Sequence, residues 1–431
     1  GMSSEASAMQ DRGQVYRKVV LRLMPILFLC YILAYLDRVN VGFAKLAMKE
    51  ELWFSDAVFA FGSGIFFIGY FLFEVPANVI MHRIGARIWL TRIMISWGCL
   101  SALCAVSHNA VVFYMLRFLL GMAEAGFFPG IILYLTYWFP MKYRARIVAL
   151  FMTAVAFAGI IGSPLSGWIL QRSDDWMEIR SWKWLFILEG IPSILLGSLL
   201  PLFLKDGPMQ VSWLSEREKT LIRTDLEENE ESKRSTGKHL EKLSDAFNSW
   251  KVWLCCLIYL GLTIGLYGVS FWLPQLIELT LTNVKWQIGL YAAIPWLAAA
   301  IGMNVFGQHS DRTGERRWHI SLAALGSAIG FVVCGVGLTY FPSWAVLVSM
   351  VVATTGMMCA VSSFWALPTS MLSGTAAAAG IAWINSVGNL GGFISPELFN
   401  WFKTHFSVGI ALVSIAFFMS MSGALVWKFW K

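Results

Sequence analysis

Several charged side chains lie inside long apolar segments of this sequence. Placing Asp, Arg or Lys at the centre of a membrane helix costs roughly 2.5 to 3.5 kcal/mol, whereas a leucine returns only a few tenths. Charged residues in such segments are therefore candidates for carrying an ion or binding a charged substrate. The candidates are Asp37, Arg38, Glu74, Arg117, Glu124, Glu189 and Glu397.

Two acids and two bases form the most informative part of this set. Arg117 and Glu124 are seven residues apart, so on a helix they share a face but lie about 10 Å apart along the axis. They cannot pair with each other, and Asp37 and Arg38 are the expected partners on a neighbouring helix. An arginine can hold a substrate carboxylate while an acid takes up a proton, which predicts coupled transport of an anion and protons. A buried ion network that fixes helix packing is the alternative.

The three other acids carry less information. Glu74, Glu189 and Glu397 each lie close to a proline or glycine, where a helix can end. A structural role is at least as strongly indicated for them as a functional one.

The composition identifies the kind of protein that must position these charges. Of the 431 residues, 57% are hydrophobic and only 14% are charged, about half the charged share of a soluble domain. The basic residues behind the net charge of +7 fall in short clusters between apolar segments, which indicates membrane topology and not nucleic-acid binding. No cysteine or histidine spacing predicts a disulfide, metal or cofactor site, and no catalytic motif is present, so an enzyme is not expected.

The apolar segments predict an all-α integral membrane protein with twelve transmembrane helices in two pseudo-symmetric halves of six. Each segment has the roughly 20 apolar residues that a span requires. The expected spans are 19–48, 57–81, 88–107, 110–136, 146–170, 184–204, 252–279, 286–307, 318–340, 343–370, 377–401 and 407–429.

The domain organisation follows from one long polar stretch. We expect a tail at 1–18, an N-terminal bundle at 19–204, a linker with amphipathic helical pieces at 205–250 and a C-terminal bundle at 251–431. Lysine and arginine clusters then fall mostly on one side, which predicts that both termini and the linker are cytoplasmic.

A repeat supports this division. NVIMHRIGAR, which contains Arg83, Gly85 and Arg87, follows the second span, and GQHSDRTGER, which contains Asp311, Arg312, Gly314 and Arg316, follows the eighth. Both resemble the signature loop GxxxDRxGxR of the major facilitator superfamily, in which this loop latches the two halves together. The first copy departs from the pattern, with Asn78 in place of the glycine and His82 in place of the aspartate.

Longer motifs are similar to those of one branch of that superfamily, the anion:cation symporters. The Asp-Arg pair followed by NVGFA, RFLLGMAEAGFFPG (117–130) and INSVGNLGGFISP (384–396) carry the resemblance. FEVPAN (73–78) and GSPLSGWIL (162–170) look closest to its tartrate and sugar-acid members.

The resemblance implies roles for individual residues. Arg38 matches the arginine that binds the substrate carboxylate, Asp37 and Glu124 match acids that protonate, and Arg117 matches a base that modulates one of them. Other positions match polar or aromatic residues around the substrate: Tyr35, Tyr70, Ser362, Trp365, Asn385 and, as the helical neighbour of Asn385, Asn389. Val155 stands where some sugar-acid members have an amide, so a short dicarboxylate or an aromatic acid fits as well as a sugar acid.

The sequence therefore predicts a proton-coupled symporter that imports an organic carboxylate across a bacterial inner membrane. The expected partners are the small organic anion, protons and the lipid bilayer, with no nucleic acid, and the expected state is a monomer. An exporter or exchanger of amphiphilic or organic-anion compounds is the alternative, favoured by the apolar segment around Val155.

Overall fold

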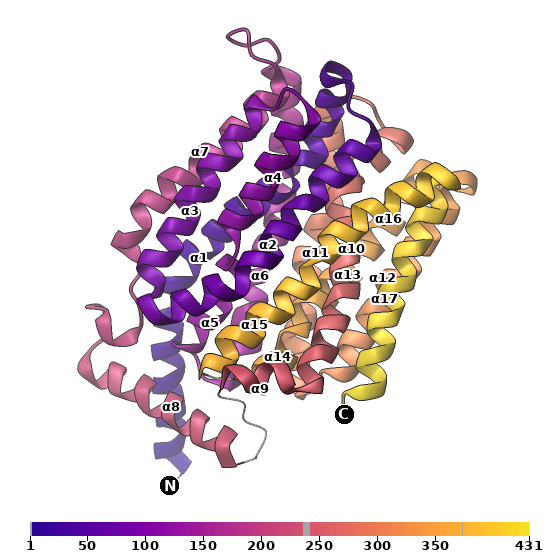
Figure 1. The fold of residues 1–431 in the computed structure, drawn as a ribbon. Coiled ribbons are helices and arrows are strands. Elements are labelled where there is room, and N and C mark those ends of the chain that lie inside the picture. The colour runs from indigo at the N-terminus through magenta and orange to yellow at the C-terminus, as the bar shows by residue number, and fades with distance from the viewer. Residues whose placement is uncertain (1, 236–241, 373) are drawn as a thin grey trace.

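The computed structural model describes residues 2–235, 242–372 and 374–431, and helices dominate these ranges. Figure 1 shows them as a bundle of long helices. The α-helices are α1 (Met2–Leu52), α2 (Asp56–Ile84), α3 (Ala86–Leu103), α4 (Ala110–Glu124), α5 (Phe127–Thr136), α6 (Met141–Arg172), α7 (Ser181–Phe203), α8 (Glu216–Ser235), α9 (Leu243–Asn248), α10 (Trp250–Thr280), α11 (Lys285–Thr313), α12 (Arg317–Tyr340), α13 (Ser343–Phe364), α14 (Ala366–Thr369), α15 (Gly374–Asn389), α16 (Gly391–His405) and α17 (Val408–Phe429).

Eleven stretches of the described chain are long and apolar enough to cross a membrane. They match eleven of the twelve expected spans, with α4 and α5 forming one stretch and α13 and α14 another. The remaining span, 377–401, was expected as one helix and is instead divided at Leu390 into α15 and α16, of 16 and 15 residues. The division falls beside Gly391 and Gly392, and glycine is a poor helix former. Together the two helices make the twelfth passage through the bundle (Figure 1).

The long helices form two halves, as the composition and repeat predict. Helices α1 to α7 make the N-terminal half and α10 to α17 the C-terminal half (Figure 1). Across the division α6 packs along α11, α2 packs along α15 and α16, and α1 contacts α10. A site between the halves is therefore lined by α1, α2, α10 and α15.

The N-terminal tail and the linker pack on one end of the bundle. Helix α1 begins at Met2, well before the expected start of the span at 19, and its first turns contact α8. Asp11 forms an ion pair of 2.6 Å with Arg217, and Lys18 one of 3.2 Å with Glu218. The tail and the linker are thus held together at this end, which also carries α9 and α14 (Figure 1).

Glycines allow α2 and α4 to approach closely. A Cβ added at Gly121 would lie 1.9 Å from the carbonyl oxygen of Phe66, and one added at Gly69 would lie 2.4 Å from that of Phe118. Both neighbours are backbone atoms, so a side chain could be accommodated only by separating the two helices.

We therefore expect Gly121→Ala to destabilise the protein by about 1 to 3 kcal/mol, the usual cost of overpacking. Gly326, inside α12, is the matched control because a Cβ there meets no atom within 4 Å. Gly326→Ala should be neutral or stabilising by up to about 1 kcal/mol, since alanine favours a helix interior. Thermal unfolding of the two purified variants checks this, and equal melting temperatures would contradict the packing argument.

Candidate functional site

Asp37 and Arg38 are adjacent on α1 and face different neighbours, because successive residues on a helix point about 100° apart. Both side chains are buried. The Asp37 carboxylate accepts a hydrogen bond of 3.0 Å from Ser101 on α3, within the N-terminal half. The Arg38 guanidinium points to the division between the halves, where it meets residues of α2, α4 and α10.

Arg38 is the centre of the polar network between the halves. Its Nε donates to Glu124 in a buried ion pair, and its two terminal nitrogens donate to the hydroxyls of Tyr267, at 3.1 Å, and Tyr70, at 3.4 Å. The cation also lies 5.0 Å from the ring centre of Tyr70 and 5.9 Å from that of Phe66. A planar guanidinium with several directed donors suits a carboxylate better than a lysine does.

A break in the fourth span places Glu124 against Arg38. Glu124 is the last residue of α4, and Gly126 adopts a left-handed conformation with φ of 87° before α5 begins. Residues other than glycine rarely adopt this backbone conformation, and a Cβ at Gly126 would also lie 2.7 Å from Ala77. The second carboxylate oxygen of Glu124, Oε2, has no hydrogen-bond partner among the described residues. It can therefore carry a proton without breaking an existing bond.

Arg117 does not pair with Asp37 as expected. Its guanidinium donates to three backbone carbonyls, those of Gly62 at 3.2 Å, Asp37 at 3.4 Å and Arg38 at 3.5 Å. The Asp37 side chain turns towards Ser101 instead, because residue 37 faces α3. The expectation that both bases pair with an acid is thus wrong for Arg117, which fixes the backbone at the Asp-Arg pair.

Helix α15 brings both predicted asparagines into the network. Asn385 donates to the Tyr70 hydroxyl at 2.8 Å and to Glu74 at 2.5 Å, and it accepts from Asn389 at 2.8 Å. Asn389 in turn accepts from the Tyr267 hydroxyl at 2.8 Å. Arg38, Tyr70, Asn385, Asn389 and Tyr267 therefore form a closed ring of polar contacts across the two halves.

The other predicted substrate residues lie outside this ring. The Tyr35 hydroxyl is 3.0 Å from that of Ser270 on α10. Ser362 donates to the carbonyl of Cys359 on its own helix, at 3.3 Å. Trp365 is buried at the junction of α13 and α14, with its ring centre 4.9 Å from that of Tyr259 and 5.4 Å from that of Phe128.

Three residues were missed by the sequence reasoning: Tyr267 and Ser270 on α10, and Ser386 on α15. Tyr267 and Ser270 are three residues apart in an apolar segment, so they share a helix face. That spacing could have identified them. Glu74, for which a structural role was favoured, bridges the halves with Ser386, which donates to it at 2.7 Å. Nothing in the local sequence links Glu74 to a residue 312 positions away.

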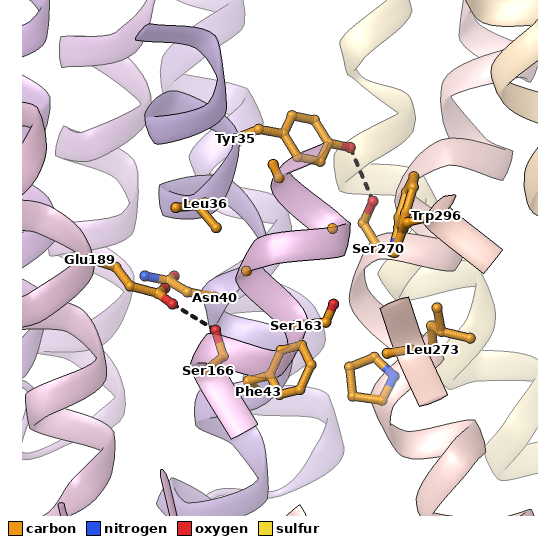
Figure 2. A pocket seen from close by; sticks show the side chains of 15 residues that line it. Tyr35, Leu36, Asn40, Phe43, Ser163, Ser166, Glu189, Ser270, Leu273 and Trp296 are labelled. Carbon is orange, nitrogen blue, oxygen red and sulfur yellow. Dashed lines mark hydrogen bonds between the residues drawn. The ribbon is translucent and has the colours of Figure 1, made fainter. Parts of the chain in front are cut away.

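The structure is closed around Arg38, whose side chain is only 2% exposed. Figure 2 shows a narrow pocket lined by residues of α1, α6, α7, α10 and α11. Tyr35, Ser270 and Trp296 lie at one end of the view, and Asn40, Ser166 and Glu189 at the other, where Ser166 donates to Glu189 at 2.6 Å. The cavity measures about 20 Å³, room for a water molecule and not for an organic acid.

The two signature loops lie at the end of the bundle that carries α8 and α9. Gly85 and Gly314 both have positive φ, 98° and 68°, and end α2 and α11. In the second copy Asp311 and Arg316 form an ion pair of 2.6 Å, whereas Arg312 is exposed. In the first copy Arg83 is exposed. The backbone N–H of Arg87 donates to Asp206, and its side-chain Nε donates to the carbonyl of Pro201.

The residues that depart from the signature make contacts of their own. Asn78 donates to the carbonyl of Ala378 on α15 at 2.6 Å, a bond between the halves. His82 lies 2.5 Å from the Tyr137 hydroxyl at the end of α5. The first loop is therefore accompanied by a direct contact between the halves, made by an asparagine where the pattern has glycine.

Within the described residues, no group of three His, Cys, Asp or Glu side chains could hold a metal ion. The ring around Arg38 offers hydrogen-bond donors and a guanidinium, and the carboxylates of Glu124 and Glu74 contact it. Groups of these types can form charge-assisted hydrogen bonds and can take up or release protons.

Comparison with known proteins gives consistent results. The family model "Major Facilitator Superfamily" matches residues 27–396. A protein of Agrobacterium vitis named "Putative tartrate transporter" is 43% identical over 415 residues, which cover 93% of this chain and 90% of the relative. The "Quinolone resistance transporter" of Acinetobacter baumannii is 38% identical over 414 residues, 94% of this chain and 93% of the relative.

The solved structures agree on the fold. That of the proton:xylose symporter XylE superposes with a TM-score of 0.76 and covers 95% of each chain, at 15% identity. At this identity the likeness concerns the arrangement of helices alone.

Proposed function

The chain belongs to the major facilitator superfamily, and from that premise we propose that it is a proton-coupled symporter of an organic carboxylate. As a member it is a multi-pass membrane transporter of a small molecule and not an enzyme. The observation that carries the proposal is the buried Arg38, whose guanidinium is shared between Glu124 and two tyrosine hydroxyls at the division between the halves.

The geometry suggests how a carboxylate would be bound. Glu124 already occupies the Nε side of Arg38 with a carboxylate group. A substrate carboxylate can take the same place when Glu124 gives it up, with the hydroxyls of Tyr267 and Tyr70 beside it. Arginine forms such bonds in pairs with planar carboxylates, which gives both strength and orientation.

Proton binding would act on the same ion pair, that between Glu124 and Arg38. A proton on Oε2 of Glu124 removes the negative charge that holds Arg38, so the arginine becomes available to the substrate. Asp37 also has an unpartnered oxygen, Oδ2, and is the second proposed proton carrier. Arg117, which bonds the carbonyls of residues 37 and 38, keeps both side chains in position.

We propose organic carboxylates as the substrate class. A relative named for tartrate transport and the buried arginine both favour an organic carboxylate. Tartrate-like diacids, sugar acids and aromatic acids all provide the carboxylate that Arg38 would bind. We propose that Asn385, Asn389, Tyr35, Ser362 and Trp365 contact the rest of the acid once the halves separate.

The cellular setting is part of the proposal. The basic clusters favour a bacterial inner membrane with both termini, the linker 205–250 and the signature loops in the cytoplasm. The loops that hold Arg83, Gly85, Arg87, Asp311, Arg312, Gly314 and Arg316 would then close the cytoplasmic side. A monomer is the proposed unit, because the proposed path runs between two halves of one chain.

Thermal unfolding of the purified protein with a panel of carboxylic acids, at acid and at alkaline pH, tests the proposal. A bound acid at 100 times its Kd should stabilise the protein by about 2.7 kcal/mol. The effect should be greater at acid pH, because protonation of Glu124 releases Arg38. The matching amide of each acid is the control and should give no shift, since it lacks the charge. Equal shifts with acid and amide, or none with any acid, would refute carboxylate binding.

A second candidate function rests on one of the relatives. The protein of Acinetobacter baumannii is named for quinolone resistance, which favours export or exchange of an amphiphilic compound. Shifts with neutral or cationic amphiphiles, and none with small acids, would support this alternative.

A further inference from the structure

A cluster of lysines lies around one aspartate at the end of the bundle opposite α8 and α9. Asp56, the first residue of α2, forms ion pairs with Lys45 at 3.0 Å and Lys49 at 3.6 Å, both on α1. Its other oxygen pairs with Lys403, near the end of α16, at 2.7 Å. Asp56 therefore joins the two halves of the protein through opposite charges.

The charges in this cluster do not balance. Three ammonium groups face a single carboxylate, which leaves an excess of two positive charges. Of the two acids that precede Asp56 in the chain, Glu50 is exposed beside Lys49, and Glu51 is engaged with Arg180 and with the Trp182 indole. Excess charge of one sign at the mouth of a path attracts ions of the other sign and raises their local concentration.

Two of the lysines, Lys45 and Lys403, lie close to the ring of one tryptophan, Trp272. The Nζ of Lys45 is 4.0 Å from the ring centre of Trp272 on α10, and the Nζ of Lys403 is 5.5 Å from it. Lys45 also donates to Gln275 at 2.9 Å, and only 7% of its side chain is exposed. A positive charge that is this well buried is costly unless it is paired. The buried ammonium group of Lys45 therefore requires a negatively charged partner.

Lys45 and Arg38 lie along the same seam between α1 and α10. They are seven residues apart, two turns, so they share a face of α1 and lie about 10 Å apart along its axis. Arg38 contacts Tyr267 of α10 and Lys45 contacts Gln275 of the same helix. The helices are in close contact between these points, where a Cβ at Gly42 would lie 3.1 Å from the carbonyl of Phe271.

We propose that Lys45, Lys403 and Trp272 form an outer binding site for the carboxylate of the substrate, which Asp56 occupies when the halves are closed. An arriving carboxylate replaces Asp56 on the two lysines. This removes the ion pair between the halves at this end, and the anion can then move two turns along the seam to Arg38. This inference rests on the proposed function, from which it takes the substrate class.

Lys403→Gln and Asp56→Asn distinguish this site from a simple latch, because both changes break the same ion pair. If the pair only holds the halves together, the two variants should change the KM of uptake in the same direction. If the lysines also bind the substrate, Lys403→Gln and Lys45→Gln should raise KM by roughly three- to tenfold through loss of attraction. Asp56→Asn should leave KM unchanged or lower it, since it removes a competing carboxylate.

The measurement is initial uptake into proteoliposomes over a range of acid concentrations, at low and at high ionic strength. Lys183→Gln, on α7 near the same end, is the matched control for loss of one positive charge and should change KM less than twofold. The increases in KM caused by Lys45→Gln and Lys403→Gln should be smaller at high ionic strength. Lys403→Arg, which keeps the positive charge, should have the KM of the unaltered protein.

Three outcomes decide the matter. A higher KM for Lys403→Gln together with an unchanged or lower KM for Asp56→Asn supports the outer site. Effects in the same direction, or an equal effect of Lys183→Gln, overturn it while uptake by the unaltered protein still supports the proposed function. No uptake of any acid by the unaltered protein overturns both.

Discussion

Replacing Arg38 with alanine should abolish uptake of the acid, with a loss of roughly 100-fold or more in kcat/KM. Truncating one member of a buried, hydrogen-bonded charge pair costs about 2 to 5 kcal/mol. The loss should be specific, because the Arg38 guanidinium contacts Glu124, Tyr70 and Tyr267 together. Counterflow of labelled acid in proteoliposomes measures it independently of the proton gradient.

The controls separate binding from folding. Arg92, on α3, is also a partly buried arginine in a span, but it contacts the carbonyl of Ala123 and the ring of Trp89. Arg92→Ala should therefore insert normally and retain uptake. Arg38→Lys keeps the charge but loses the paired donors, so an intermediate activity is expected. Counterflow at the level of the unaltered protein in Arg38→Ala would eliminate Arg38 as the carboxylate anchor.

Replacing Glu124 with glutamine should remove accumulation driven by a pH gradient while exchange of the acid continues. Glutamine keeps the shape and one oxygen for Arg38, but it cannot take up and release a proton. One pH unit is worth about 1.4 kcal/mol per proton, so each coupled proton supports about tenfold accumulation per pH unit. The variant should lose the share carried by Glu124, and its exchange rate should become less sensitive to pH.

Glu397 provides the matched control for this change. It is a partly buried carboxylate on α16 that lies outside the Arg38 ring. Glu397→Gln should leave the accumulation ratio as it is, whereas Asp37→Asn should reduce it if Asp37 is the second carrier. Accumulation by Glu124→Gln equal to that of the unaltered protein would show that the proton travels by another group.

The sequence could predict the class of fold because spans are determined locally. Length and apolar content decide whether a segment can cross a bilayer, and eleven stretches were found where they were expected. The prediction of a single helix at 377–401 was wrong, because Leu390 divides this segment into two helices. Gly391 lies against α10 there, where a Cβ would be 2.2 Å from the Thr263 hydroxyl, and a contact of that kind is not visible in the segment itself.

By itself the sequence determined which residues are available for chemistry and which of them share a helix face. Seven charged residues in apolar segments, and the seven-residue spacing of Arg117 and Glu124, follow from composition and helical period alone. The pairing of Glu124 with Arg38 was among the expected contacts, but only the tertiary structure decided that Arg117 binds backbone carbonyls and that Tyr267 completes the ring. The physical reason is that the helical period fixes the direction of each side chain around the axis of its own helix. The partners of a side chain depend instead on how the helices pack, and packing can join residues more than 300 positions apart, such as Glu74 and Asn385.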